Sequence, residues 1–251
     1  PARRTARGGP DIMSTAFLAL WNDIDRPEAR AEYEAWHALE HVPERVGLPG
    51  FVYGHRYVGD SGYFTLYGLE SLAALDSAEY ADVIANPTPW SARMRPRLSA
   101  FMRRPCILQA QAGASSGAAL TTLKAVTTDV QAWAAQAARW AEQAVQQGRL
   151  LRVMAGVVPV ERSLHYPVGG ERIAEQAQGE VTVVMLAEHL DGPACTQGTQ
   201  WWADRMQAHH LETPAQQAFG LQTRVCRSQL ALPASGRLPP LMELMAGYAD
   251  C

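Results

Sequence analysis

The stretch WHALEHVPERVGLPGFVYGHRYV, residues 36–58, gathers histidine, glutamate, arginine and aromatic side chains around two prolines and a glycine turn. Its helical half should end around Val42–Arg45, because Pro43 disfavours helical geometry in the residue before it. Gly47–Gly50 predicts a turn into a strand over Phe51–Val58. Alternation along that strand should place four side chains on one face: Phe51, Tyr53, His55 and Tyr57. The stretch therefore predicts both a helix–turn–strand unit and a candidate site.

The sequence on either side completes one βαββαβ unit. Upstream, Asp25 has the features of a helix N-cap, with Pro27 in the first turn and Glu28 three residues on. Downstream, Asp60–Gly62 predicts a hairpin loop. Apolar runs and helical spacing predict the remaining elements: strands over Ser14–Trp21, Tyr63–Leu69 and Pro105–Gln111, and a helix over Ser71–Ala85. This order is typical of the ferredoxin-like split-βαβ unit.

The second half of the chain repeats this order beyond a small-residue linker. WSARM at Trp90–Met94 has an echo in WADRM at Trp202–Met206, and an apolar strand follows each. The other elements expected here are strands over Leu120–Val126, Leu150–Val160, Glu180–Glu188 and Leu221–Leu230, and helices over Val130–Gln147 and Gln200–His210. Two ferredoxin-like sheets can bury their open faces against each other. The predicted fold class is therefore α+β, with two tandem ferredoxin-like βαββαβ repeats that form an intrachain antiparallel α/β barrel.

The domain organisation predicted from these patterns has five parts. Residues 1–13, which contain an arginine cluster without apolar partners, are expected to be a disordered leader. Residues 14–111 form the first repeat, which carries the candidate site, and residues 112–118 form a linker. Residues 119–232 form the second repeat. The tail, 233–251, includes the apolar run LMELMAGY, which should dock as a short helix.

Composition and charge disfavour several classes of protein. Of the 251 residues, 47% are hydrophobic and 19% are charged, and the net charge of -3 argues against a nucleic-acid partner. No apolar run approaches the ~20 residues of a transmembrane helix, so no membrane partner is expected. The four cysteines lack CxxC spacing, which indicates free thiols and a cytoplasmic location. The sequence also lacks glycine-rich phosphate loops and a GxSxG elbow.

The run from Phe17 to Val58 resembles the dimeric α/β-barrel superfamily. Its motifs are the WN strand end, the EYEAWHALEHVPERVGLPGF helix and turn, and the GHRYV strand, and the likeness is greatest to EthD-like and muconolactone-isomerase-like proteins. The likeness covers Thr15–Gln111, whereas the second half shares only the topology. It implies the barrel fold and an activity within a family of cofactor-free isomerases, decarboxylases, cyclases, small monooxygenases and, in other branches, haem enzymes. By the EHxPE signature, His41 is the family's histidine, Glu40 precedes it and Glu44 follows the proline.

The residues expected to carry catalysis are His41, His37 and Glu40. A histidine at the end of a helix can turn toward a cavity, and an ordinary pKa near 6.5 suits proton transfer at neutral pH. Its alternative role is to cap the helix, where the dipole favours a charged ring. His37 is four residues earlier, so both rings can share one helical face. The HxxEH spacing also occurs in inverted zinc proteases, and a two-histidine metal site with a glutamate is chemically open, but the prediction is no metal.

The residues expected to contact a substrate are Tyr53, His55, Tyr57, Trp90 and Glu44. If the strand face with the tyrosines and His55 lines the barrel, it would offer a polar and aromatic wall to a ring-shaped ligand. The alternative is an ordinary sheet face with hydroxyls toward solvent. Trp90 would either cover the pocket or pack in the core.

Three histidines and one arginine are expected to lie outside the site. Arg56 should be an ion-pair residue that faces solvent or a helix. His209 and His210 should mark a solvated helix end, and His165 should be exposed in a long polar loop.

Three functions remain open from the sequence. The first is a small cofactor-independent isomerase, decarboxylase or lyase, in which His41 takes and returns a proton alpha to a carbonyl of a lactone or phenolic organic acid. Glu40 or His37 would orient the histidine, and tyrosine hydroxyls would polarise the enolate. The second is a haem- or quinol-type oxidoreductase of the same fold, and the third is a non-catalytic ligand-binding or stress protein. The first function implies a small organic substrate and no haem, flavin or nucleotide, with a homodimer as the assembly to test.

Overall fold

The computed structural model describes residues 14–60, 62–160, 179–208, 216–234 and 236–248. In these residues eight antiparallel strands close into a barrel in the order β1-β3-β2-β8-β5-β7-β6-β4. The strands are β1 (Ala16–Ile24), β2 (Phe51–Gly59), β3 (Gly62–Leu69), β4 (Leu98–Gly113), β5 (Ala119–Thr127), β6 (Arg152–Val157), β7 (Val181–His189) and β8 (Gln216–Cys226). The predicted fold class, two ferredoxin-like repeats in an intrachain barrel, is confirmed.

Each half of the chain supplies four neighbouring strands, and the barrel closes where the halves meet. The first repeat has the order β4-β1-β3-β2 and the second the corresponding order β8-β5-β7-β6. The seams are β2 with β8 and β4 with β6, both antiparallel. The sequence echo falls on corresponding helices, α4 (Pro89–Met94) before β4 and α6 (Gly192–Ala208) before β8. Its tryptophans, Trp90 and Trp202, are both buried.

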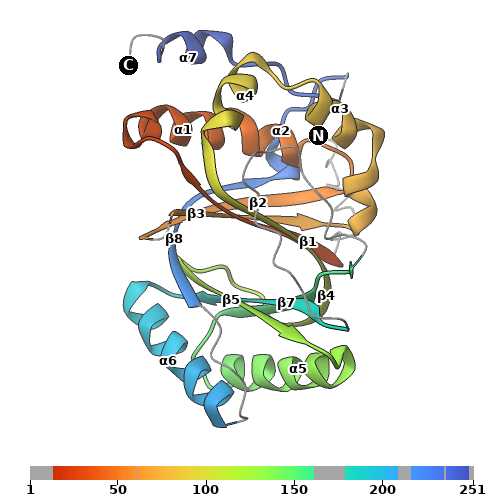
Figure 1. The fold of residues 1–251 in the computed structure, drawn as a ribbon, viewed down its shortest axis with the longest axis vertical. Coiled ribbons are helices and arrows are strands. Elements are labelled where there is room, and N and C mark those ends of the chain that lie inside the picture. The colour runs from red at the N-terminus through yellow and green to blue at the C-terminus, as the bar shows by residue number, and fades with distance from the viewer. Residues whose placement is uncertain (1–13, 61, 161–178, 209–215, 235, 249–251) are drawn as a thin grey trace, which may run out of the picture.

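Helices cover the barrel on two opposite sides (Figure 1). Over β1, β2 and β3 lie the helices of the first repeat and the tail helix: α1 (Arg30–Trp36), α2 (Val42–Val46), α3 (Ala78–Ala85), α4 and α7 (Met242–Ala246). On the other side lie α5 (Val130–Gln146) and α6. The short tail helix docks as expected, because Leu241, Met245 and Tyr248 pack on the cluster around Trp36 and Trp90.

Each strand alternates between a barrel core and a helix-facing layer. Large side chains from both repeats fill the barrel core, among them Phe17, Trp21, Tyr57, Phe64 and Phe219. The layer under the first repeat's helices includes Leu18, Val42, Val46, Phe51 and Tyr67. The layer under α5 and α6 includes Ala137, Trp140, Leu150, Val153 and Trp202. The sheet therefore separates two environments in which a site can form.

A bulge changes one face assignment made from strict alternation. The register of β2 against β3 shifts between Phe51 and Tyr53. Phe51 consequently packs in the helix layer, with its ring 5.6 Å from Tyr67 and 5.7 Å from Tyr80. The prediction that Phe51 shares a face with Tyr53 is wrong, because an irregular residue reverses the alternation.

Two helix starts also differ from the prediction. Arg26, not Asp25, is the N-cap residue of a 3-10 turn that precedes α1, and it makes no side-chain capping bond. The Asp25 carboxylate instead lies 3.6 Å from Arg97, an ion pair that links the first helix to the start of β4. The helix predicted over Ser71–Ala85 is split, because Ser77 is extended and its hydroxyl caps α3.

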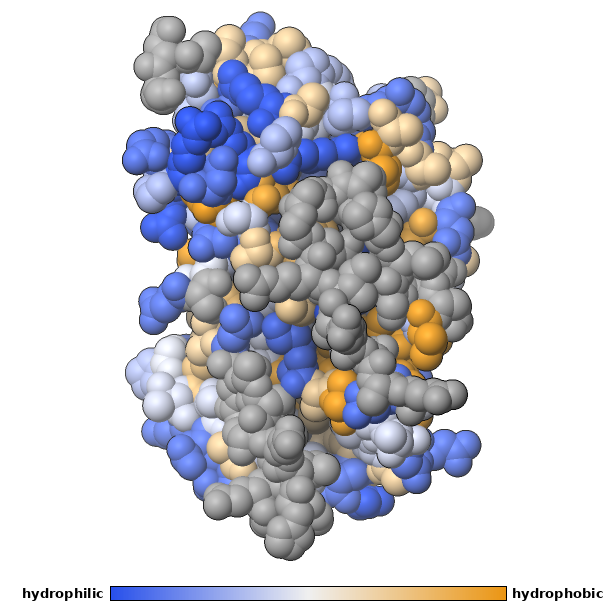
Figure 2. Space-filling model, viewed as in Figure 1, coloured by the Kyte–Doolittle hydropathy of each residue, from blue (hydrophilic) through white to orange (hydrophobic). Residues whose placement is uncertain are grey.

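The molecular surface is mixed. Figure 2 shows hydrophilic residues mainly over the two helical ends of the molecule, with hydrophobic residues scattered mostly across the middle of this face. The exposed large hydrophobic residues, such as Leu39, Val126 and Leu190, belong to different parts of the chain. Within the described ranges, no helix has both the length and the apolar character needed to span a membrane.

Candidate functional site

A π-helical turn interrupts the first helix at the residues predicted to carry catalysis. Residues His37–His41 form this wider turn between α1 and α2, and the N–H of Val42 donates to the carbonyl of His37. Pro43 has no N–H, and in a regular helix its ring would clash with the carbonyl four residues earlier. The wider turn accommodates the proline, so the helix continues to Val46. His41 therefore lies inside a continuous helix, not at its end as predicted, and such π turns are frequent at functional sites.

His37 and His41 both line the space between this turn and the sheet. Their ring centroids are 5.1 Å apart, and the His41 ring lies 4.5 Å from that of Trp36. Neither Nδ1 atom has a hydrogen-bond partner among the described residues. Burial lowers the pKa of both rings well below the ordinary value, and the nearby positive charges of Arg45 and Arg56 lower it further. Both rings are therefore neutral near pH 7, the form that can accept a proton.

Glu40 holds other segments against the helix. Its Oε1 accepts a hydrogen bond from the Thr88 hydroxyl at 2.5 Å, and its Oε2 accepts one from the N–H of Leu241 at 2.8 Å. Within the described contacts, Glu40 makes no hydrogen bond to His41. The geometry therefore supports a role in fixing the start of α4 and the C-terminal segment.

Glu44 is also buried and tied to charged partners. Its carboxylate lies 3.0 Å from Arg45 and 2.9 Å from Arg237. Arg237 also reaches Asp82 at 3.0 Å. Glu44 thus links the helix to the C-terminal segment, and among the described residues it does not line the cavity beside the histidines.

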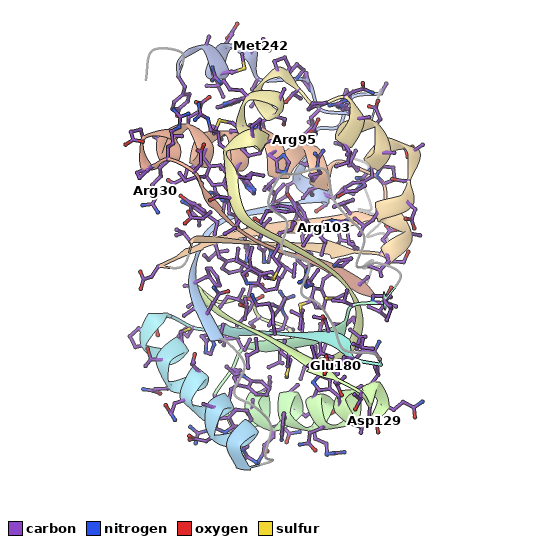
Figure 3. All side chains as sticks on the ribbon, viewed as in Figure 1. Arg30, Arg95, Arg103, Asp129, Glu180 and Met242 are labelled. Atoms are coloured by element: carbon purple, nitrogen blue, oxygen red, sulfur yellow. The ribbon has the colours of Figure 1, made fainter. Side chains whose placement is uncertain are left out.

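A cavity of about 40 Å³ lies between the π-helical turn and the helix-facing side of the sheet. Its polar walls are Asn22 and Thr65 from β1 and β3, the two histidines, and three arginines, Arg45, Arg95 and Arg103. Figure 3 shows Arg95 at the level of the helices and Arg103 lower, on the sheet. A water molecule needs about 10–15 Å³ of such space, so the cavity has room for about three waters. It matches a carboxylate group or O₂ in size, not an aromatic ring.

The cavity can open on the side of β4. Among its lining residues, Leu20, His41, Arg95, Leu98 and Arg103 keep partial exposure to solvent. His41 and two of the arginines therefore lie where a larger molecule would enter, while His37 and Thr65 are deeper.

A β-bulge shapes this entrance. Trp21 pairs with Met102 but Asp23 pairs with Ser99, so β4 has one residue more than β1. Ala100, within the bulge, has a φ of 47°. Bulges re-aim side chains, and here the residues that follow Ala100 bring Phe101 and Arg103 to the cavity wall. β4 accordingly begins at Leu98, seven residues before the predicted start.

Tyr53, His55 and Tyr57 lie on the other face of the sheet, inside the barrel. The rings of Tyr53 and His55 are 4.7 Å apart, and His55 Nδ1 is 3.3 Å from the Tyr57 hydroxyl. Burial lowers the pKa of His55 to about 3 and raises that of Tyr57 above its ordinary value. The sheet separates these residues from His37 and His41. The predicted site residues therefore form two groups that do not meet.

Trp90 and Arg56 have buried positions beside the cavity. Trp90 packs in the core, with Nε1 donating to Glu32 at 2.9 Å, and it is not among the cavity-lining residues. Arg56 faces the helix, as one of its predicted alternatives, but it has no ion pair among the described residues. Its guanidinium is fully buried between the rings of Tyr33 and Tyr63, 4.7 and 4.6 Å away.

Sequence reasoning missed the cationic and hydroxyl side chains of the cavity: Asn22, Arg45, Thr65, Arg95 and Arg103. The signal that could have indicated the arginines is the run RMRPRLSAFMRR, residues 93–104, with five arginines. His165, His209 and His210 lie outside the described residues. In the described part of the chain, no group of three or more His, Cys, Asp or Glu side chains could hold a metal ion.

Comparison with known proteins identifies the fold. No family model matches the sequence, and no curated protein matches it. Solved structures do match: an anthrone oxidase-like protein has a TM-score of 0.55 at 12% identity, over 87% of this chain and 95% of that chain. A candidate monooxygenase from Lactobacillus acidophilus has a TM-score of 0.52 at 8% identity, over 85% and 97%. A candidate monooxygenase from Fusobacterium nucleatum has 0.52 at 9%, over 85% and 95%.

These matches span nearly the whole of both chains at very low identity, so they show a shared architecture. The chain has the ferredoxin-like α/β-barrel fold with two repeats, as the resemblance implied. A relation to the EthD-like or muconolactone-isomerase-like proteins in particular stays a prediction.

Proposed function

We propose that this protein is an oxidoreductase without a bound cofactor, which acts on a phenolic or enolisable organic molecule and uses His41 as the base. The observation that carries the proposal is a neutral histidine at the open side of a cavity whose other polar walls include three arginines. A neutral imidazole can accept a proton, and guanidinium groups stabilise the oxyanion that the substrate then becomes.

The lowered pKa of His41 fits this role when the substrate is considered. By itself it makes the free histidine a weak base. A negative charge that develops next to the ring favours the imidazolium and raises the pKa of His41 during the reaction. His37, with its ring 5.1 Å away, would keep the surroundings of His41 uncharged and so limit competing ion pairs.

An oxidative outcome is supported by the neighbours in fold, which are described as monooxygenases and an anthrone oxidase-like protein. A phenolate or enolate can give one electron to O₂, and the resulting carbon radical and superoxide combine into a new C–O bond. The same proton abstraction without O₂ leads to the isomerisation or lyase reactions considered from the sequence. O₂ consumption therefore separates the two outcomes.

A haem does not fit the residues of this cavity. Pockets for molecules of drug size have volumes of about 300–1,000 Å³, several times the space between the turn and the sheet. The rings of Trp36 and Phe51 and the backbone of the π turn bound that space. We therefore derive no step through haem, and the proposed chemistry uses the side chains of the chain and O₂.

The test is O₂ uptake by the purified protein with a panel of hydroxynaphthalenes and anthrones, with and without air. His41→Gln should lower kcat/KM by about 10²–10⁴-fold, the usual loss of a general base. The matched control is His55→Gln, a buried histidine inside the barrel, which should change kcat/KM by less than about tenfold if its role is structural. Equal melting temperatures would show that both variants fold. A large loss for His55→Gln alone would move the site into the barrel, and undiminished turnover without air would replace oxidation by isomerase or lyase chemistry.

A further inference from the structure

The charge of the cavity wall is one-sided. Of the described residues that line it, three are arginines and none is aspartate or glutamate. The two histidines are neutral, so they do not balance those charges. Charged walls around a closed space concentrate ligands of opposite charge.

Only one of these arginines has a printed carboxylate partner close by, and that carboxylate is shared. Glu44 lies 3.0 Å from Arg45 and also 2.9 Å from Arg237, so one negative charge serves two positive ones. Arg95 donates to the backbone carbonyls of Val83 and Ile84 at 2.7 and 2.8 Å, which are uncharged acceptors. These contacts hold the guanidinium groups in place without cancelling their charge.

Behind the wall is a second cation, in a row of unpaired polar groups. Thr65, Arg56 and Thr223 are direct neighbours across β3, β2 and β8. Each has a buried polar atom without a hydrogen-bond partner in the described structure: the two threonine hydroxyls, and Nε and Nη2 of Arg56. Buried polar atoms are nearly always paired, so a cluster of exceptions indicates a place for a ligand. Thr65 and the unpaired Nδ1 of His37 both belong to residues that line the cavity.

From this charge and these unpaired atoms, we infer that the cavity binds the oxyanion end of an organic anion, a carboxylate or a phenolate, and that Arg103 contacts it from the entrance. The space of about 40 Å³ admits such a group, while the rest of the molecule lies toward the partly exposed side at Leu98 and Arg103. This inference rests on the proposed function for the site and specifies its substrate class. Neutral lactones and unsubstituted ketones are then poor ligands.

The test measures binding to the full chain with sodium benzoate as the probe and benzamide, its neutral isostere, as the control. Quenching of tryptophan fluorescence is a suitable signal, because Trp36 lines the cavity. The matched variants are Arg103→Gln and Arg104→Gln. These residues are adjacent on β4, both are partly exposed, and Arg103 lines the cavity whereas Arg104 acts electrostatically on Cys106 in the barrel core.

Benzoate should bind and benzamide should bind at least tenfold more weakly. Arg103→Gln should raise the Kd for benzoate by about 10- to 100-fold, as expected for loss of a charge-assisted hydrogen bond, and Arg104→Gln by less than about threefold. Benzoate binding no tighter than benzamide binding, or equal effects of the two variants, overturns the inference.

Failure of the inference can be distinguished from failure of the proposed function. His41→Gln should retain benzoate binding while it loses turnover. If turnover depends on His41 but benzoate shows no preference over benzamide, the base is correct and the substrate class is wrong. If benzoate binds through Arg103 but His41→Gln remains fully active, the anion site stands and the catalytic assignment falls.

Discussion

Arg30–Val46 and Val130–Gln146 are the first helical segments of the two repeats and are equally long. The first contains Pro43 and a π-helical turn, and it brings two histidines to a cavity. The second is an uninterrupted helix whose buried face consists of Ala137, Trp140, Ala141 and Ala144. A regular helix with small residues approaches the sheet closely, whereas the π turn leaves space beneath it.

The layers beneath these helices differ in the same way. Under α5 and α6, the rings of Trp140 and Trp202 lie 6.0 Å apart and fill the space over the sheet. Under the first helix, Thr65 and Arg56 retain unpaired polar atoms in fully buried positions. Dense apolar packing stabilises a fold, and unpaired buried polar groups destabilise it. The duplicated fold thus allows the second repeat to supply stability while the first keeps a polar site.

The largest expected effect comes from a pair of matched threonines. Thr65 and Thr121 are both fully buried in corresponding sheets, but the Thr121 hydroxyl lies 2.9 Å from both His189 Nε2 and the Thr199 hydroxyl. Thr121→Val leaves those partners unpaired and should destabilise the protein by about 1–3 kcal/mol. Thr65→Val removes a hydroxyl without a protein partner and should leave stability unchanged or raise it by up to about 1 kcal/mol. Urea unfolding of both variants at pH 7 gives the two free energies.

The same pair can contradict the comparison between repeats. Thr65→Val may not lower benzoate affinity if the hydroxyl faces away from the ligand, so stability is the primary measurement. An equal loss of stability in both variants would mean that the Thr65 hydroxyl is as well satisfied as that of Thr121. The first repeat would then carry no destabilising polar layer.

Acid should destabilise the protein through its buried neutral histidines, more in the first repeat than in the second. Burial lowers the pKa of His37 and His41 well below the ordinary 6.5, and that of His189 to about 4. Between the folded and unfolded pKa values, only the unfolded chain takes up the proton, so stability is complete above about pH 6.5 and is lost as the pH falls. Each such histidine contributes a slope of up to about 1.4 kcal/mol per pH unit.

The measurement is the free energy of unfolding between pH 7.5 and 5. The double variant His37→Gln/His41→Gln should flatten its pH dependence about twice as much as His189→Gln. Equal flattening would show that one histidine of the first repeat is already protonated in the folded protein. The assignment of two neutral rings to the cavity would then be wrong.

The sequence predicted the duplicated fold because apolar periodicity, turn residues and the WSARM/WADRM echo are local features. It also identified His37 and His41, because a proline close to two histidines is unusual in a helix. It could not predict that Arg103 and Thr65 join them, because those positions depend on strand pairing and on a bulge of one residue. The same limit explains Phe51, which strict alternation assigned to the barrel face. The tyrosines of β2 were grouped with the histidines because sequence proximity does not reveal that a sheet lies between them.

The smallest expected effect tests whether that bulge is strained. Ala100 has a positive φ of 47°, a left-handed conformation that costs a residue with a Cβ about 1–2 kcal/mol. Glycine adopts it freely but loses more entropy on folding, so Ala100→Gly should stabilise the protein by up to about 1 kcal/mol. The control is Ser99→Gly, at the neighbouring position without positive φ, which should destabilise by about 0.5–1 kcal/mol. Melting temperatures give the sign of each change, and benzoate titration shows whether Phe101 and Arg103 keep their positions. If Ala100→Gly lowers the melting temperature as much as Ser99→Gly does, the bulge is unstrained and the entrance of the first repeat is held without the cost inferred for it.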